Sequence, residues 1–586
     1  MRQWMVAAKK ADFYAIAEKF HVDPVVARII RNREVIGEKN IRIYLGGNLS
    51  DLSDPHQMKD MDRLVEILAQ KIRKQVHIRI IGDYDVDGVT SSHLFLTALR
   101  RVGAKVDVLI PHRIQDGYGL SLHLLQQAKE DGVDTILTCD NGIAAIDEIA
   151  WAKAQKMTVL VTDHHAVPFE EHEGRRTEKK SLADAVVNPH QQDCGYPYKE
   201  LCGAGVAWNV IRVLYENYDM DKREAEDLLD FVAMATVCDV MSLTGENRIL
   251  VKEGLKRIRH TKNIGLQALM QACNVQPENI SAYHFGYVLG PCVNATGRLD
   301  TARHALRLFE TGQETEAEEI ARDLVDLNQE RKELTLQGVE MAKKLCEEGG
   351  YENDPILVLF LPDVHESIAG LIAGRIREMY NRPVFVLTRG EEGVKGSGRS
   401  TENYSMYENM CGCAELFTKF GGHPMAAGLS LPEENVEKFR RKINENCPLT
   451  VEEVCPDIHI DMAMPVGYAS TELVHQFALL EPFGKDNPSP LFADRNLSIS
   501  RMWVIGKNRN VLRMSVLSEY GQPVPVIFFG DVETLFAYFT EKFGQKEVEN
   551  ALHGRKNRIL FSMVYTAKVD FYQGNENLQL EMKYYR

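Results

Sequence analysis

The sequence predicts an α/β protein with a mostly parallel sheet, a long connecting helix, a smaller α/β domain and a C-terminal β-barrel. Short β-rich runs alternate with helical segments from about residue 75 to 240. Such alternation is typical of a parallel sheet with helices on both faces. After the segment "NENCPLTVEEVCPD" the composition changes to many short β-rich runs separated by turns. That change favours a small barrel or sandwich.

We expect five segments along the chain. Residues 1–50 contain helical pieces, clearest in "DPVVARIIRN", and residues 51–265 form the parallel-sheet domain. Residues 266–350 form a helical connector, because much of this stretch is charged, helix-prone and nearly free of Gly and Pro. Residues 351–446 form the second α/β unit, and residues 447–586 form the β-rich domain.

Composition is that of a globular protein, with 586 residues and 44% hydrophobic content. No run approaches the roughly 18 apolar residues that a membrane span needs, and the first residues lack the apolar core of a signal peptide. The 11 cysteines form no Cys-x-x-Cys pair, which favours reduced thiols and a cytoplasmic location. The net charge of −15 argues against non-specific nucleic-acid binding, although the charge of local surface patches decides whether a nucleic acid binds.

The stretch "HIRIIGDYDVDGVTSS" contains Asp-x-Asp-x-Asp-Gly, the opening pattern of a helix–loop–helix calcium site. Such a loop needs a bidentate Glu at its twelfth position. Counted from Asp83, that position is Leu94. The preceding run also favours a strand over an entering helix. The calcium interpretation is therefore excluded, and the carboxylates need another explanation.

Four polar groups are predicted to follow strands. In a parallel sheet the carboxyl ends of the strands meet at one edge, where ligands bind. Asp and His together suit Mn²⁺ and similar ions. Two such ions about 3.5–4 Å apart share a bridging carboxylate and activate a hydroxide for attack on phosphorus. The groups are Asp83, Asp85 and Asp87; Asp140; Asp163, His164 and His165; and Asp239.

Each group alone has an ordinary structural explanation. "TDHH" is compatible with a helix N-cap followed by surface imidazoles, and Asp140 precedes a typical Asn-Gly turn. Asp239 follows the apolar run "FVAMATVC" and is compatible with a helix cap. Independent caps would not all gather at one sheet edge, so the groups taken together favour a metal site. Phosphate loops are absent, and "GAGVAW" lacks the third glycine of a dinucleotide loop.

These motifs resemble those of a known family. "DYDVDG", "CDNG", "TDHH" and "CDVMSL" are similar to successive motifs of the DHH phosphoesterase superfamily. "VNATGRL", "HESIAGLIAGRI", "KGSGRS" and "FGGHPMAAGLSL" resemble its DHHA1 companion domain. "LLEPFGKDNPSPLF" and the β-rich tail resemble the oligonucleotide-binding (OB) region of the RecJ family of single-strand-specific 5′→3′ DNA exonucleases. The resemblance covers nearly the whole chain in order and implies an OB-like C-terminal barrel.

The resemblance implies roles for the clustered residues. Asp85 and Asp87 would be metal ligands with Asp83 beside them, Asp140 would bridge two Mn²⁺ or Mg²⁺ ions, and His164 and Asp239 would complete the set. His165 would face the scissile phosphate or tune the metal site, and we group it with Asp140 and Asp163 as catalytic. Cys238, Cys292, Ser367 and Asp486 differ from residues common in the family, but none is an expected ligand.

A second set of residues is expected to bind the substrate. Arg matches a phosphate with two parallel hydrogen bonds, and glycines let backbone amides approach an oxyanion. Within the resemblance, "GSGRS" would hold the 5′-terminal phosphate, and His423 would lie near the substrate and the metals. The expected substrate-binding residues are Arg113, Arg298, Arg375, Ser397, Arg399 and His423.

The resulting hypothesis is a two-metal exonuclease that releases 5′-mononucleotides from single-stranded DNA in recombination and repair. The resemblance also implies a helicase and a single-strand-binding protein as partners, and we expect a monomer without membrane association. One alternative is a phosphodiesterase of the same superfamily that acts on nanoRNA or cyclic dinucleotides. Another is a catalytically silent nucleic-acid-binding scaffold.

Overall fold

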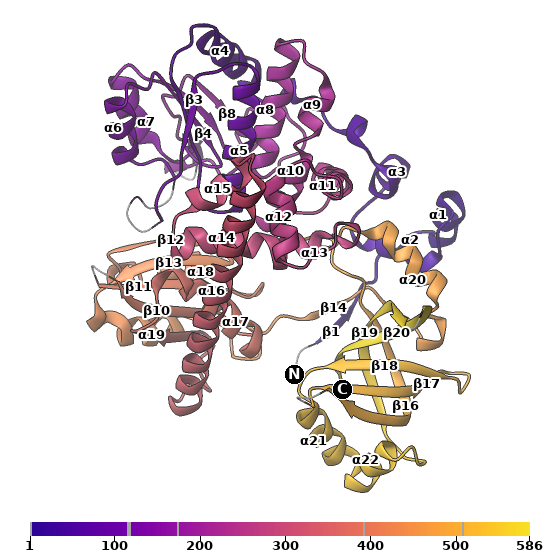
Figure 1. Cartoon of the computed structure of the whole chain (residues 1–586). Coiled ribbons are helices and arrows are strands. Elements are labelled where there is room, and N and C mark those ends of the chain that lie inside the picture. The colour runs from indigo at the N-terminus through magenta and orange to yellow at the C-terminus, as the bar shows by residue number, and fades with distance from the viewer. Residues whose placement is uncertain are drawn as a thin grey trace. The chain divides into compact units, whose positions relative to one another are not determined.

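The computed structural model describes residues 3–113, 116, 119–172, 175–390, 393–506, 509–572 and 574–586. The chain forms two compact units (Figure 1). The core unit is Asn48–Pro456, and the barrel unit combines the N-terminal segment up to Gly47 with Asp457–Arg586. No described helix has the length and apolar character needed to cross a membrane.

The core unit contains the predicted parallel sheet. Its strands lie in the order β3-β2-β4-β5-β8, and every neighbouring pair is parallel. Strand β2 is buried along its whole length, as expected for a sheet covered on both faces. The strands are β2 (Ile78–Ile81), β3 (Val106–Leu109), β4 (Thr135–Cys139), β5 (Thr158–Thr162) and β8 (Ala185–Val187).

Helices cover both faces of this sheet. Adjacent residues of β2 point to opposite faces, so Ile80 packs in one hydrophobic cluster with α4, α5 and α8, whereas Ile81 packs in another with α6 and α7 (Figure 1). Beyond β5, the strands β6 (Phe169–His172) and β7 (Arg175–Glu178) form a hairpin. The covering helices are α4 (Met61–Arg73), α5 (Val86–Arg101), α6 (Leu122–Glu130), α7 (Ile146–Ala154) and α8 (Gly203–Asn217).

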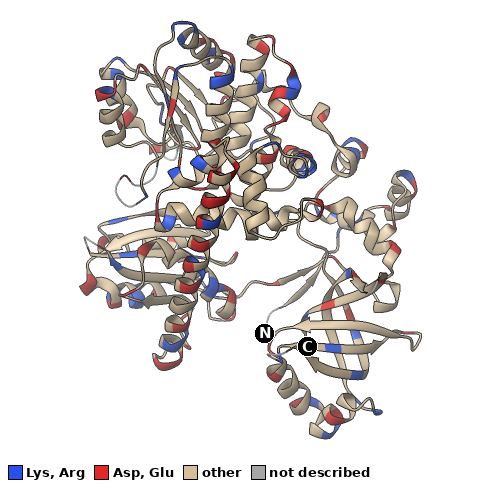
Figure 2. Ribbon diagram, viewed as in Figure 1, with Lys and Arg blue, Asp and Glu red and all other residues tan. Residues whose placement is uncertain are grey.

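A helical region follows the sheet. The helix α16 (Glu314–Glu348) packs on α12 and α14 at one end and on α17 at the other. Figure 2 shows both signs of charge along it, and its buried stripe includes Ile320, Leu324 and Val339. The other helices are α9 (Lys222–Glu226), α10 (Leu229–Cys238), α11 (Gly245–Ile258), α12 (Ile264–Ala272), α13 (Ala282–His284), the π-helix η4 (Phe285–Leu289), α14 (Gly290–Leu299) and α15 (Ala302–Glu310).

The second α/β sheet completes the core unit, as predicted. Its order is β12-β13-β11-β10-β9; only the β9–β10 pair is parallel among these described strands. The strands are β9 (Leu357–Phe360), β10 (Val384–Gly390), β11 (Gly393–Arg399), β12 (Lys419–His423) and β13 (Ala426–Leu431), and the helices are α17 (Glu366–Tyr380), α18 (Met406–Cys411) and α19 (Val436–Glu445).

The barrel unit is a closed β-barrel, as predicted. Its strands lie in the order β15-β16-β17-β18-β20-β19, and pairing of β16 with β19 closes the sheet. The strands are β15 (Met462–Ala463), β16 (Phe492–Ile505), β17 (Val511–Leu517), β18 (Pro523–Phe529), β19 (Leu560–Tyr572) and β20 (Asn575–Tyr585), with helices α20 (Thr471–Phe477), α21 (Val532–Phe543) and α22 (Gln545–Leu552).

The N-terminal segment packs with this barrel. Arg33 makes a two-point ion pair with the buried carboxylate of Asp461, at 2.7 and 3.1 Å. Beside the barrel, β1 (Trp4–Val6) pairs in parallel with β14 (Ile458–Ile460). The segment otherwise contains the predicted helical pieces, α1 (Phe13–Phe20), α2 (Pro24–Asn32) and α3 (Glu38–Gly46).

Candidate active site

Three acidic residues follow β2, as predicted. Asp83 is 1% exposed, and Asp85 caps α5 by accepting a hydrogen bond from the Gly88 amide at 3.0 Å. The glycine of this motif serves close packing, because a Cβ at Gly88 would lie 2.4 Å from the Asp83 nitrogen. The motif therefore places its carboxylates at the start of a buried helix.

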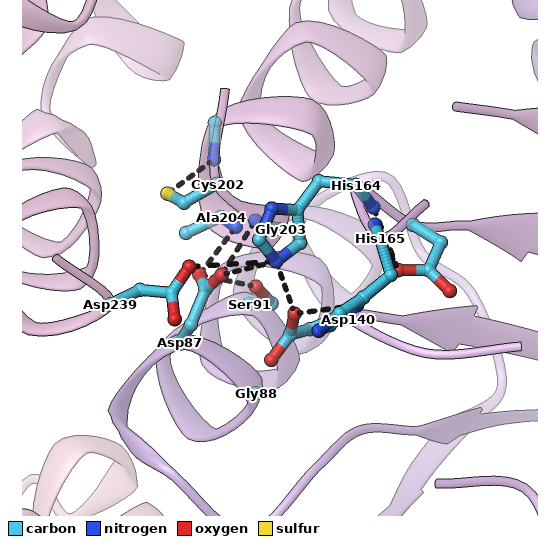
Figure 3. Close-up of polar contacts among 12 residues, drawn as sticks. Asp87, Gly88, Ser91, Asp140, His164, His165, Cys202, Gly203, Ala204 and Asp239 are labelled. Carbon is cyan, nitrogen blue, oxygen red and sulfur yellow. Dashed lines mark hydrogen bonds and ion pairs between the residues drawn. The ribbon is translucent and has the colours of Figure 1, made fainter. Parts of the chain in front are cut away.

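Asp87 faces the N-terminus of α8. Its two carboxylate oxygens accept hydrogen bonds from the backbone amides of Gly203 and Ala204 at 2.6 and 2.7 Å (Figure 3). A helix N-terminus stabilises a negative charge through its free amides and its dipole. The "GAGVAW" segment is thus part of the site, a role that sequence reasoning missed.

Asp140 follows β4 in a left-handed backbone conformation, with φ of 61°. The next residue holds this turn, because the Asn141 side chain donates to the carbonyls of Ile81 and Cys139 at 3.0 and 2.9 Å. Asp140 also packs against the start of α8, where a Cβ at Gly203 would lie 2.6 Å from the Asp140 Cβ. A glycine is required there to bring the α8 amides and the Asp140 carboxylate into one site.

Asp163 orients the two histidines that follow β5. Its carboxylate accepts from the Ile143 amide at 2.9 Å, from the His164 amide at 2.7 Å and from His165 Nδ1 at 2.8 Å. Burial opposes protonation of His165, but this hydrogen bond and the surrounding carboxylates raise its pKa to about 9. Burial likewise opposes ionisation of Asp163, but the hydrogen bond from His165 lowers its pKa.

These side chains converge on His164. Its Nε2 lies 3.0 Å from Asp140 Oδ1 and 3.6 Å from oxygens of both Asp87 and Asp239 (Figure 3). Three groups of residues could each hold a metal ion, because the potential ligand atoms within each group lie within 4.8 Å of one another. Asp140 belongs to two of these groups, and His164 belongs to two. The groups are Asp140, His164 and His165; Asp87, His164 and Asp239; and Asp83, Asp85 and Asp140.

The prediction that Asp239 follows a strand is wrong. Asp239 is the C-cap of helix α10, and its backbone amide donates to the carbonyl of Ala235. The residues of α10 from Leu229 to Thr236 are buried, and a helix buried all round shows no helical periodicity. In sequence it therefore has the same appearance as a buried strand.

The cluster carries more negative charge than its surroundings balance. Burial and neighbouring carboxylates raise the pKa of Asp83 and Asp140 well above the usual range for aspartate and also raise that of Asp85. Asp83 Oδ1 is buried and accepts no hydrogen bond from the described part of the chain. Hard divalent cations prefer carboxylate ligands, with imidazole favouring transition metals. These residues therefore fit a pair of Mn²⁺ or Mg²⁺ ions.

A cavity of about 450 Å³ opens beside the acidic cluster, between the two α/β domains of the core unit. Tyr84 and Arg113 line it from one domain, and Ser397 lines it from the other. The Arg113 guanidinium lies 4.9 Å from the centre of the Tyr84 ring. Lys395 and Lys419, which the sequence analysis did not identify, also line this cavity.

Two further arginines lie next to residues that line this cavity, although neither arginine lines it itself. Arg298 donates to the carbonyl of Ser367 at 2.7 Å, and a Cβ at Gly370 would lie within 3 Å of both Arg399 Nη2 and Ser397 Oγ. Burial, together with the nearby charges of Arg113, Arg331 and Arg399, lowers the pKa of Arg298 to about 9. Clustered cations of this kind favour an anionic ligand.

The other two expected substrate residues lie elsewhere in the core unit. The Arg375 side chain is 70% exposed and pairs with Glu378 at 3.7 Å. His423 is exposed at the end of β12. The structure brings neither residue to the cavity lining.

Comparison with known proteins agrees with this architecture. The DHH family N-terminal domain matches residues 77–236, the DHHA1 domain matches 353–447 and the RecJ OB domain matches 460–584. The fold, the convergent acidic site and these matches thus assign the chain to the DHH class of proteins.

Two relatives and one solved structure narrow this class. The single-stranded-DNA-specific exonuclease RecJ of Haemophilus influenzae is 32% identical, with 96% of each chain covered. The exonuclease of the same name from Bacillus subtilis is 33% identical over 87% of this chain and 63% of its own length. RecJ from Thermus thermophilus, solved in complex with Mn²⁺, has a TM-score of 0.79 and 25% identity over 100% of this chain and 79% of its own. The chain belongs to the RecJ family.

Proposed function

We propose that this protein is a divalent-metal-dependent exonuclease that degrades single-stranded DNA from the 5′ end and releases 5′-mononucleotides. The observation that carries the proposal is the set of three ligand groups, which are linked because Asp140 belongs to two of them and His164 belongs to two of them. The names of the family relatives, which are single-stranded-DNA-specific exonucleases, support the same activity.

Asp83, Asp85, Asp87, Asp140, His164 and Asp239 would hold the metal ions. When bound, two ions would supply Lewis-acid stabilisation of phosphate charge and an activated nucleophile. The T. thermophilus protein was solved in complex with Mn²⁺, which supports Mn²⁺ as a metal for this site. The buried, unpartnered Asp83 Oδ1 gives independent support, because a buried carboxylate oxygen without a donor is stabilised by a cation.

His165 would hold a proton beside the substrate. The hydrogen bond from Nδ1 to Asp163 favours the protonated imidazole, and the pKa of His165 is raised to about 9. Its side chain is 39% exposed, in contrast to the buried His164. The cationic ring would attract a phosphodiester, and Nε2–H would be the donor to a phosphate oxygen. Asp163 would act through His165 by fixing its orientation.

The cavity beside the cluster would bind the 5′ end. Arg113 lines it and Ser397 adds a hydroxyl donor, while Arg298 and Arg399 bring further positive charge next to the lining residues Ser367 and Ser397. Arg375 and His423 have less support, because Arg375 is exposed and pairs with Glu378, and His423 is exposed at the end of β12.

The barrel unit favours this proposal over a phosphodiesterase for dinucleotides. A substrate of two residues has no need of the additional OB domain that matches residues 460–584. The complete set of acids and histidines argues against a silent scaffold. As finer points of the proposal, the enzyme acts in DNA repair and recombination as a cytoplasmic monomer, with a helicase and a single-strand-binding protein as partners.

The test uses labelled oligonucleotides with Mn²⁺, with Mg²⁺ and with EDTA. We expect mononucleotides from a 5′-phosphorylated single strand, slow cleavage of duplex and of a dinucleotide, and no cleavage in EDTA. Asp140→Ala should lose nearly all cleavage while its far-ultraviolet circular dichroism stays that of the wild type. Wild-type rates for Asp140→Ala, or faster cleavage of the dinucleotide than of the long strand, would refute the proposal.

A further inference from the structure

Two cysteines lie in contact with each other where α12 ends against α14, the helix that borders the active site. Cys273 is the C-cap of α12 and is partly exposed, whereas Cys292 lies within α14 and is 1% exposed. Their Sγ atoms are 3.8 Å apart. Neither thiol has a role in the proposed cleavage reaction.

The surroundings make the two thiols chemically unequal. The hydrogen bond between them lowers the pKa of the Cys273 thiol, with a further contribution from Lys332, and raises that of the Cys292 thiol. Asn328 donates to Cys292 Sγ at 3.3 Å, so the buried sulfur is held in place. A solvent-accessible thiol of lowered pKa next to a second thiol is the arrangement found in peroxide-sensing cysteine pairs.

We propose that Cys273 and Cys292 form an oxidation site that closes to a disulfide in response to peroxides. The Cys273 thiolate attacks the peroxide O–O bond, which breaks; the sulfur becomes a sulfenic acid, and the second oxygen leaves as hydroxide or alkoxide. Cys292 Sγ then attacks the Cys273 sulfur, so that the S–S bond forms, the S–O bond breaks and the oxygen leaves as water with the thiol proton. The two thiols lose two electrons in total, which the peroxide takes up.

Closure requires a modest movement. A disulfide has a sulfur–sulfur distance of about 2.05 Å, so the two sulfurs must approach from their present 3.8 Å. The Cys273 side of the pair is a partly exposed helix end, followed by Asn274 in a left-handed turn with φ of 55°. Cys292 is buried near the start of α14, so strain from closure acts on that helix.

Helix α14 connects this pair to the proposed active site. Asn294, two residues after Cys292, accepts a hydrogen bond from the Val86 amide at 3.2 Å, at the start of the helix that carries Asp87. Arg298 on the same helix donates to Ser367 beside the cavity. A displacement of α14 therefore moves the acidic loop and Arg298 together, and we expect oxidation to slow cleavage.

The oxidation itself is tested without any assay of cleavage. The purified protein is treated with hydrogen peroxide, free thiols are blocked by alkylation, and peptides are analysed by mass spectrometry. We expect a crosslinked peptide that joins Cys273 to Cys292 and that a dithiol reductant removes. If Cys273 and Cys292 stay uncrosslinked at peroxide doses that oxidise the exposed Cys411, the proposed site is wrong.

The effect on cleavage rests on the proposed function and is measured separately. Wild type and the control Cys411→Ser should lose at least about tenfold in rate on oxidation and recover on reduction, because displacements on the order of 1 Å cost up to about 100-fold. Cys273→Ser should keep its rate in peroxide. The switch would be overturned if the crosslinked protein cleaves as fast as the protein with free thiols. It would also be overturned if peroxide slows the Cys273→Ser variant as much as it slows the wild type. Absence of cleavage in untreated protein would instead refute the proposed function and leave the crosslink standing.

Discussion

Replacing Gly203 by alanine tests how closely the start of α8 must approach Asp140. The new Cβ would lie 2.6 Å from the Asp140 Cβ and 3.0 Å from its Cα. Ordinary contacts begin near 3.4 Å, so the two backbones must separate by several tenths of an ångström or more. The same movement pulls the amides of Gly203 and Ala204 away from Asp87. Since displacements on the order of 1 Å cost up to about 100-fold in rate, we expect Gly203→Ala to lose ~10- to 100-fold in kcat.

Gly205→Ala is the matched control in the same helix. Its Cβ would lie 3.4 Å from its nearest neighbours on Leu201, an ordinary contact, and both glycines lie in the first turn of α8. Single-turnover cleavage of a 5′-phosphorylated strand with saturating Mn²⁺ measures the chemical step, and thermal denaturation checks the fold. Equal rates for the two variants would refute the close packing that we assign to Gly203.

Three further predictions concern single side chains. Burial raises the pKa of Asp230 to about 6, so the folded protein binds this proton more tightly than the unfolded chain does. Asp230→Asn should therefore raise the free energy of unfolding by about 3 kcal/mol at pH 7, and this gain should disappear as the pH falls from 6 to 4. No gain at pH 7 would show that the carboxylate is solvated. Arg33→Met removes the cation that pairs with the buried Asp461 carboxylate and should lower the free energy of unfolding by about 3–5 kcal/mol, measured by chemical denaturation. A change below about 1 kcal/mol would contradict the burial of this ion pair. Arg399→Gln should reduce the preference for a 5′-phosphate over a 5′-hydroxyl by roughly 10- to 100-fold in kcat/KM, while the exposed Arg375→Gln should keep it; the reverse result would place the 5′ end elsewhere.

Much of the sheet and its acidic edge could be predicted from the sequence. The runs before Asp83, Asp140 and Asp163 are short, β-rich and followed directly by polar residues, and the structure has a parallel strand in each place. Because parallel strands end at one edge, the spacing of the motifs alone predicts that these acids converge.

The remaining parts depend on packing between distant segments. Asp239 reaches the site from the end of a fully buried helix, which has no sequence signature that separates it from a strand. The contribution of "GAGVAW" was missed because its glycines serve backbone approach to Asp87 and Asp140, not to a ligand phosphate. Lys395 and Lys419 line the cavity through pairing of β11 and β13 and of β12 and β13, whose register could not be predicted from sequence.

The central claim is that the clustered acids and His164 hold a pair of divalent cations. Titration of Mn²⁺ into the metal-free protein, followed by calorimetry and electron paramagnetic resonance, measures it directly. We expect two ions per chain with the spectrum of a spin-coupled pair in the wild type, and loss of both the coupling and at least one ion in Asp140→Ala. If Asp140→Ala binds the same coupled pair with wild-type affinity, the metal centre lies somewhere other than at this cluster.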